Sequence, residues 1–142
     1  MDTDALGPEA GPLMRAKLHI RGGKRRLRQG KISAGILTLY DALGAAMEWH
    51  IASPERRSRL QVLKGENLND EKIIFKVLVR SGVLDNSFDY QEFDRLVERA
   101  ADEDMTGYDY RELLKGIESV MTRLGVMPFD EGELPPEDPS TF

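Results

Sequence analysis

The sequence predicts an all-α fold, a compact bundle or a set of stacked helical hairpins built from five to six helices. Apolar residues recur at helical spacing along most of the chain, and polar capping residues and glycines stand where those segments begin and end. One helix-start phrase also occurs twice. The links between the segments are short, which is typical of helices that pack against their neighbours in sequence.

The first part of the chain is predicted to form a hairpin of two long helices. The first helix covers residues 12–29 and stops before Gly30, because glycine readily takes the positive φ found after a helix C-terminus. The second helix covers residues 33–52, and the hydroxyl of Ser33 can cap its first turn.

The middle of the chain contains two further predicted helices. Ser53 can cap a short helix over residues 54–63. Residues 70–81 are apolar nearly all round and rich in β-branched side chains, so a strand is an alternative there. Asn69 before this segment and Gly82 after it are helix start and stop signals, and they favour the helix.

The repeated phrase is FDYQEF at residues 88–93, which returns twenty residues later as YDYREL at residues 108–113. In each copy the Asp can accept from the backbone N–H of N3, while the Glu three residues later reaches back. An aromatic residue before the Asp and an apolar residue at N4 complete the pattern of a hydrophobic staple. The phrase therefore predicts two helices, residues 90–101 and 110–124, which start near Asp89 and Asp109.

A chain of 142 residues is long enough for one domain with a buried core. We expect a flexible N-terminal tail over residues 1–11, a single helical domain over residues 12–126 and a disordered acidic C-terminal tail over residues 127–142. From the apolar faces, the predicted core contains Ile36, Leu39, Leu43, Met47, Ile74, Leu78, Phe93, Leu96, Leu113, Ile117 and Met121.

Composition excludes several classes of protein. The chain has no cysteine, so a disulfide framework, a thiolate metal site and a thiol nucleophile are absent. No stretch approaches the roughly 20 apolar residues that a membrane span requires. The acidic start has no apolar segment typical of a secretory signal. We therefore expect a cytoplasmic protein of bacterial type without a membrane partner.

Charge is distributed unevenly along the chain. Residues 11–31 contain eight basic residues and no acidic one, whereas residues 61–142 contain nineteen acidic and nine basic residues. A basic segment on an acidic body indicates either internal docking or contact with an anionic partner. Nucleic-acid or other polyanion binding would use the stripe formed by Lys17, Arg21, Lys24, Arg25 and Arg28. The competing interpretation pairs this stripe with residues 102–104 or with the C-terminal tail.

Residues 15–43 resemble a single tetratricopeptide unit. The matching residues are Gly23, Gly30, Ala34 and the run Leu39–Leu43, in which an aromatic residue precedes Ala-Leu. The sequence departs from the family at residues 24–26, where basic residues replace the large apolar ones of the first helix. The resemblance covers one unit, whereas such units stack in threes or more. It implies a surface for protein interaction and no catalysis.

The second copy of the repeated phrase also resembles the closing half of an EF-hand loop. Acidic residues 102–104 and Gly107 precede Glu112, but the calcium-ligand positions and the glycine cannot be satisfied in one register. Only two histidines occur, His19 and His50, and neither has a metal-binding spacing.

No motif of a nucleotide-binding loop or of a nucleophilic hydrolase is present in the sequence. We therefore expect a non-enzymatic helical interaction module, an adaptor or small regulator, without cofactor or metal. Its partner is expected to be another protein or a second copy of the chain. Polyanion binding is the first alternative, and degenerate EF-hand-like calcium binding is the second.

Overall fold

The computed structural model describes residues 3–142, and within this range it contains six α-helices, three short 3₁₀ helices and no strand. The predicted all-α fold is therefore confirmed. The 3₁₀ helices are η1 (Thr3–Leu6), η2 (Glu131–Glu133) and η3 (Pro139–Thr141). The α-helices are α1 (Ala10–Arg28), α2 (Ile32–Ala52), α3 (Pro54–Ser58), α4 (Glu71–Arg80), α5 (Tyr90–Asp102) and α6 (Arg111–Leu124). None of the described helices is long and apolar enough to cross a bilayer.

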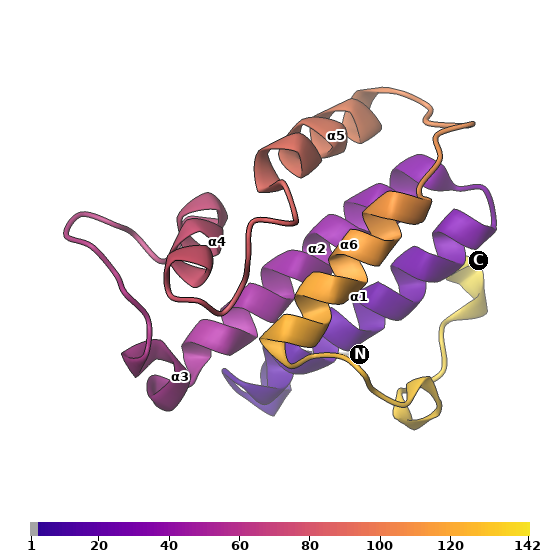
Figure 1. Cartoon of the computed structure of the whole chain (residues 1–142). Helices are drawn as coiled ribbons and strands as arrows, with labels where there is room; N and C mark the ends of the chain where they lie inside the picture. Colours follow the sequence, from indigo (N-terminus) through magenta and orange to yellow (C-terminus); the bar gives the residue numbers. More distant parts are fainter. Residues whose placement is uncertain (1–2) are drawn as a thin grey trace.

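The centre of the molecule is the antiparallel hairpin of α1 and α2, which pack along most of their length (Figure 1). Helix α6 lies along this hairpin, and α5 packs on α2. Helix α4 contacts α2 near the end that leads into α3. This arrangement leaves the outer side of α1 to be covered by segments outside the six helices.

Two glycines allow α1 and α2 to approach closely. A Cβ at Gly35 would lie 2.6 Å from Leu27 Cδ2, and a Cβ at Gly23 would lie 2.9 Å from Leu39 Cδ2. Both distances are shorter than a van der Waals contact, so each leucine fills the space that the glycine leaves. Any tightly packed hairpin can have this property, and the tetratricopeptide resemblance therefore stays a prediction.

The core lies between the hairpin, α4, α5 and α6. All of the predicted core residues are buried except Leu96 and Leu113, which are partly exposed. These two line a shallow cleft of about 300 Å³ between α5 and the start of α6, beside Phe88. The side chains of Leu96 and Leu113 therefore contact the core on one side and the cleft on the other. The core also contains residues outside the predicted set, including Ile20, Leu27, Phe75, Val77, Met105 and Val126.

The first copy of the repeated phrase starts a helix as predicted. Asp89 is the N-cap of α5 and accepts a hydrogen bond from the Glu92 backbone N–H at 3.0 Å. The rings of Phe88 and Phe93 lie 5.5 Å apart between centroids, which is the contact of a hydrophobic staple. The carboxylate of Glu92 accepts from Arg95 Nη2 at 2.8 Å instead of making the expected return bond to the start of the helix.

The second copy differs from the first. Asp109 lies one residue before the N-cap Tyr110, and it accepts from the Arg111 backbone N–H at 3.1 Å and from the Arg111 guanidinium. The helix therefore starts near Asp109, as predicted, but without a side-chain cap.

Three other predicted helix ends shift in the structure. Ser33 lies inside α2, where its hydroxyl donates to the Glu103 carbonyl and accepts from the Met105 N–H. Asp70, rather than Asn69, caps α4 by accepting from the Lys72 N–H. Ser53 caps α3 as predicted, but this helix ends at Ser58, before the expected residue 63.

The N-terminal stretch is folded onto α1 over its described part. Residues 1 and 2 of the expected flexible tail lie outside the described residues, while Thr3 in η1 is buried against the start of α1. A Cβ at Gly11 would lie 2.5 Å from the Thr3 carbonyl oxygen, so this glycine permits the contact. Helix α1 accordingly begins at Ala10, two residues before the predicted start.

Candidate binding surface on α1

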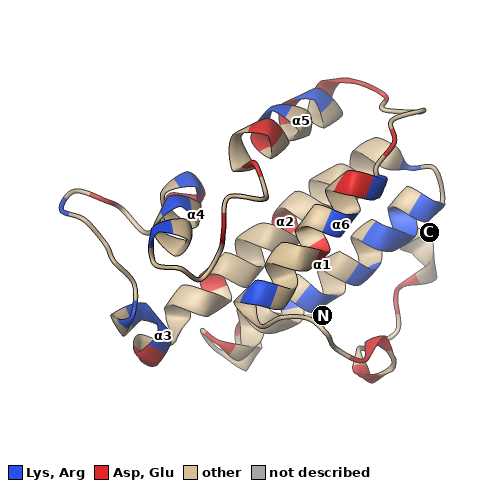
Figure 2. Ribbon diagram, viewed as in Figure 1, with Lys and Arg blue, Asp and Glu red and all other residues tan. Residues whose placement is uncertain are grey.

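The basic side of α1 faces the C-terminal segment, residues 127–142. Gly125 ends α6 with a φ of 94°, and the chain then returns along α1 through η2 and η3 (Figure 1). Figure 2 shows acidic residues of this segment beside basic residues of α1. The arrangement differs from the disordered tail that composition predicts, because composition does not reveal that an oppositely charged helix lies within reach.

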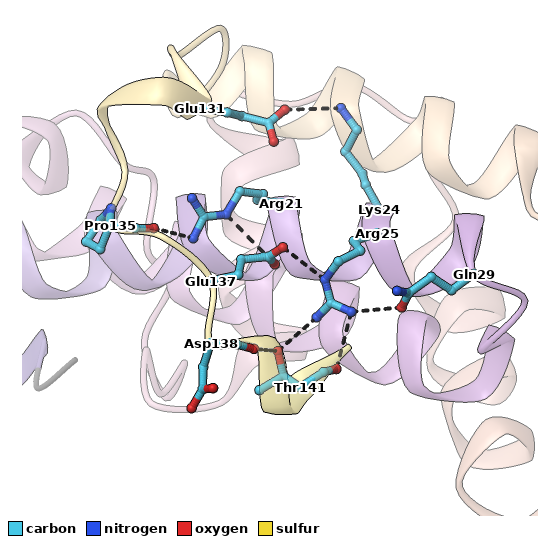
Figure 3. A network of polar contacts seen from close by, with 9 residues as sticks. All are labelled: Arg21, Lys24, Arg25, Gln29, Glu131, Pro135, Glu137, Asp138 and Thr141. Atoms are coloured by element: carbon cyan, nitrogen blue, oxygen red, sulfur yellow. Dashed lines mark hydrogen bonds and ion pairs between the residues drawn. The ribbon is translucent and has the colours of Figure 1, made fainter.

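Arg25 is the centre of this contact (Figure 3). The residue is only 8% exposed, and its Nε donates to Glu137 Oε2 at 2.9 Å. Its Nη1 donates to Gln29 Oε1 at 2.8 Å and to the Thr141 carbonyl oxygen at 3.2 Å. Its Nη2 donates to Thr141 Oγ1 at 3.2 Å. The guanidinium carbon also lies 4.6 Å from the centroid of the Phe142 ring, a cation–π distance.

This coordination determines the position of the bound segment. A guanidinium offers five donors in a rigid, planar arrangement, so partners on several sides must match its geometry together. Glu137 and Thr141 satisfy it from the C-terminal segment, while Gln29 satisfies it from the end of α1. A charge this deeply buried requires such partners, since burial without pairing is costly. Arg25 therefore holds the five residues from Glu137 to Thr141 in one register.

Arg21 and Lys24 extend the contact along α1. Arg21 Nη2 donates to the Pro135 carbonyl oxygen at 2.7 Å, and its Nε lies 3.8 Å from Glu137 Oε1. Lys24 Nζ lies 3.9 Å from Glu131 and 3.7 Å from Glu118 of α6. The lysine therefore joins α1, α6 and the C-terminal segment.

Gly22 leaves room for the Arg26 side chain beside the segment. A Cβ at this position would lie 2.8 Å from Arg26 Nη1 and 3.6 Å from Glu137 Oε1. A cleft of about 250 Å³ remains beside it, between α1 and the segment, and is lined by Arg21, Arg25 and Arg26 among others. The surface is thus a positively charged groove that an extended acidic chain fills in part.

The five residues predicted to bind a polyanion do not share one environment. Arg21, Lys24 and Arg25 contact the C-terminal segment, and Lys17 Nζ lies 5.7 Å from the centroid of the Phe129 ring in the same segment. Arg28 is exposed, and it has no partner among the described residues. The structure therefore brings four of the five together around one peptide.

The two internal acidic partners considered from sequence separate in the structure. The C-terminal segment meets the stripe, whereas residues 102–104 lie at the end of α5 beside Ser33. There Glu103 pairs with Arg99, and Asp104 accepts from the Thr106 N–H. Sequence reasoning missed Gln29, Glu137, Thr141 and Phe142 as contact residues. The acidic composition of the segment was the available signal, but it does not distinguish Glu137 from its neighbours.

The remaining titratable groups of the described residues include both histidines, His19 and His50. In the described residues no group of three or more His, Asp or Glu side chains could hold a metal ion. Burial lowers the pKa of His19, with an opposing effect from Asp41. Burial and the charge of Arg56 lower the pKa of His50, which favours its neutral form.

Comparisons with known proteins add no further assignment, because no family model, no curated protein and no solved structure matched this chain. The candidate surface therefore depends on the geometry of α1 and the C-terminal segment.

Proposed function

We propose that this protein is a non-enzymatic interaction module whose α1 surface binds an extended acidic peptide. The chain's own C-terminal segment is the resident occupant of that surface. The proposal depends chiefly on Arg25, which is buried and donates three hydrogen bonds to this segment, one of them within its ion pair with Glu137. Arginine in a desolvated pocket is typical of the residues that dominate protein interfaces.

The chemistry of the bound segment indicates the class of partner. Pro135, Pro136 and Pro139 restrict the backbone before binding, which reduces the conformational entropy that docking removes. Glu137 supplies the carboxylate, and Thr141 supplies a hydroxyl four residues later. A partner would present a proline-bearing acidic stretch with these groups at the same spacing. The module would then act as an adaptor or small regulator that exchanges its own segment for that of the partner.

The experiment uses a fluorescent peptide corresponding to residues 127–142 and the full chain. An intramolecular segment has an effective concentration in the millimolar range, so the wild-type chain should bind the free peptide weakly. Glu137→Ala in the chain weakens the resident segment and should tighten binding of the free peptide about tenfold. Glu133→Ala is the matched control, because Glu133 is an exposed acid of the same segment whose carboxylate has no partner among the described residues.

Fluorescence anisotropy distinguishes the outcomes. Adding Arg25→Gln to the Glu137→Ala chain should abolish the gain, since the main peptide contact is then lost. Two results would exclude the α1 surface as the peptide site. The Glu137→Ala and Glu133→Ala chains could bind the free peptide equally, or the Glu137→Ala chain could bind it tightly even after Arg25→Gln is added.

Polyanion binding through the same stripe is the second candidate function. Arg28 favours it, because this residue is exposed and unpaired within the described chain, and Arg26 lines the adjacent cleft. A nucleic acid would have to displace Glu131 and Glu137 before reaching Arg21, Lys24 and Arg25. Binding of a labelled oligonucleotide by the Glu137→Ala chain, with a log–log salt slope of about −4, would favour this alternative.

A further inference from the structure

A second surface lies away from α1, in the loop between α3 and α4. Val62 is 41% exposed and Leu63 is 56% exposed, and both belong to the few large apolar side chains that the described chain leaves open to solvent. Figure 1 shows this loop projecting from the helical body. Transfer of adjacent aliphatic side chains from water to an apolar environment is favourable in free energy. Their exposure on a projecting loop therefore indicates a surface for contact.

The backbone of this loop is fixed by polar contacts. The Leu63 N–H donates to Glu66 Oε1 at 2.7 Å, and Arg80 Nη1 donates to the Gln61 carbonyl oxygen at 2.8 Å. Arg80 also binds both carboxylate oxygens of Glu66, at 2.6 and 2.7 Å. The Gln61 N–H donates to Ser81 Oγ at 2.7 Å. These bonds hold the two apolar side chains outward in a defined loop conformation.

The unpaired charges beside the apolar tip are positive. Residues 53–70, which cover α3 and the loop, contain four basic and three acidic residues. Of the acidic residues, Glu55 and Glu66 pair with arginines, and Asp70 caps α4. Arg57 and Lys64 are exposed, and neither charged side chain has a partner within the described part of the chain. Arg59 pairs with Glu55 at 2.8 Å, and because both side chains are largely exposed, the pair contributes little to stability. Figure 2 shows the basic residues of α3 and of the loop. The apolar tip is therefore flanked by available positive charge.

We propose that this loop docks on an anionic lipid surface. Val62 and Leu63 enter the interfacial region, while Arg57 and Lys64 contact the headgroups. A projecting aliphatic tip with basic neighbours matches the combination of apolar burial and electrostatic attraction that peripheral membrane contacts use. A protein partner is less well supported, because leucine and valine are under-represented among the residues that dominate protein interfaces. This contact requires no membrane-spanning helix and is independent of the α1 surface.

Co-sedimentation of the full chain with phospholipid vesicles tests the proposal. Vesicles of phosphatidylcholine with about a third phosphatidylserine should bind the chain at low salt, and vesicles of phosphatidylcholine alone should not. The double variant Val62→Ser, Leu63→Ser should weaken binding about tenfold, because it lacks the methyl and methylene groups that Val62 and Leu63 bury in the lipid. Leu6→Ser is the matched control, since Leu6 is 41% exposed on η1, outside the loop.

The basic residues are tested in the same way. Arg57→Gln with Lys64→Gln should weaken binding to the anionic vesicles, whereas Arg28→Gln on α1 should not. Since the chain has no cysteine, Leu63→Cys can carry a single environment-sensitive fluorophore. Its emission should shift to shorter wavelength on anionic vesicles, while the same label at Leu6→Cys should not respond.

Three results would overturn the assignment. The wild-type chain could remain in the supernatant, which would leave a protein pocket as the other partner of the loop. Binding could persist unchanged in the Val62→Ser, Leu63→Ser variant, which would place the contact elsewhere. Equal binding to neutral and anionic vesicles would exclude the electrostatic part. None of these results bears on peptide binding by α1.

Discussion

Removal of the Glu137 carboxylate probes the contact between α1 and the C-terminal segment. If Arg25 stayed buried after Glu137→Ala, the unpaired charge would lower the free energy of unfolding by about 3–5 kcal/mol. The geometry makes a smaller loss the expectation, because the Glu137 side chain is already 19% exposed. The segment can leave α1 and admit water to Arg25 while the helices stay folded.

The expected loss in global stability is therefore about 1–2 kcal/mol, comparable with one charge-assisted hydrogen bond. For a chain of this length, each kcal/mol lowers the melting temperature by about 2–4 °C. The more direct observable is the heteronuclear NOE of the backbone amides at residues 137, 138 and 140–142, which should fall to the values of a mobile chain. Glu133→Ala should change neither quantity.

Two outcomes would refute this reasoning. A loss of 3–5 kcal/mol with an ordered segment would mean that Arg25 cannot be rehydrated locally. An unchanged NOE profile together with unchanged stability would mean that the pair does not hold the segment.

Three further predictions concern the helical body. Ile117→Ala should lower the free energy of unfolding, measured by chemical denaturation, by about 2–5 kcal/mol, because Ile117 is fully buried. Leu96→Ala should lower it by less, because Leu96 is partly exposed. Equal losses in the two variants would contradict this difference in burial. Asp89→Ala removes the cap of α5 and should cost about 1 kcal/mol, a value that thermal unfolding with Asp89→Asn as the conservative control can check. The hydrogen bond from Arg80 lowers the pKa of Glu66 from 4.5 to about 2. Its stabilising effect is therefore complete above about pH 4.5 and is lost as the pH falls toward 2. NMR titration should show the Glu66 carboxyl returning toward its ordinary pKa in Arg80→Gln, and an unchanged titration would contradict the pairing.

Features that depend on neighbouring residues could be predicted from the sequence. Asp89 and Phe88 start α5 as the repeated phrase predicts, because the cap and the staple use groups within five residues of one another. Gly125 ends α6 with positive φ for a similarly local reason. The helical periodicity likewise identified most of the core, since a helix face is determined by residue spacing alone.

Choices between equivalent local signals could not be predicted. Asn69 and Asp70 are both good capping residues, and the structure uses Asp70. Ser33 could cap α2, but its hydroxyl binds the loop after α5, which is seventy residues away in sequence at Glu103. Asp109 is held by the guanidinium of Arg111, so it does not repeat the role of Asp89. In each case a competing polar contact decides the outcome.

The sequence by itself determined the all-α class, the approximate positions of the helices and the separation of a basic first helix from an acidic C-terminal segment. Only the tertiary structure decided that these two segments meet, and that Arg25 and Glu137 form the pair at their centre. These residues are 112 positions apart, and several acids of the segment carry the same charge. Charge attraction is weakly directional, whereas burial and hydrogen-bond geometry select one partner. That selection depends on the path of the chain after Gly125, which no local pattern in the sequence determines.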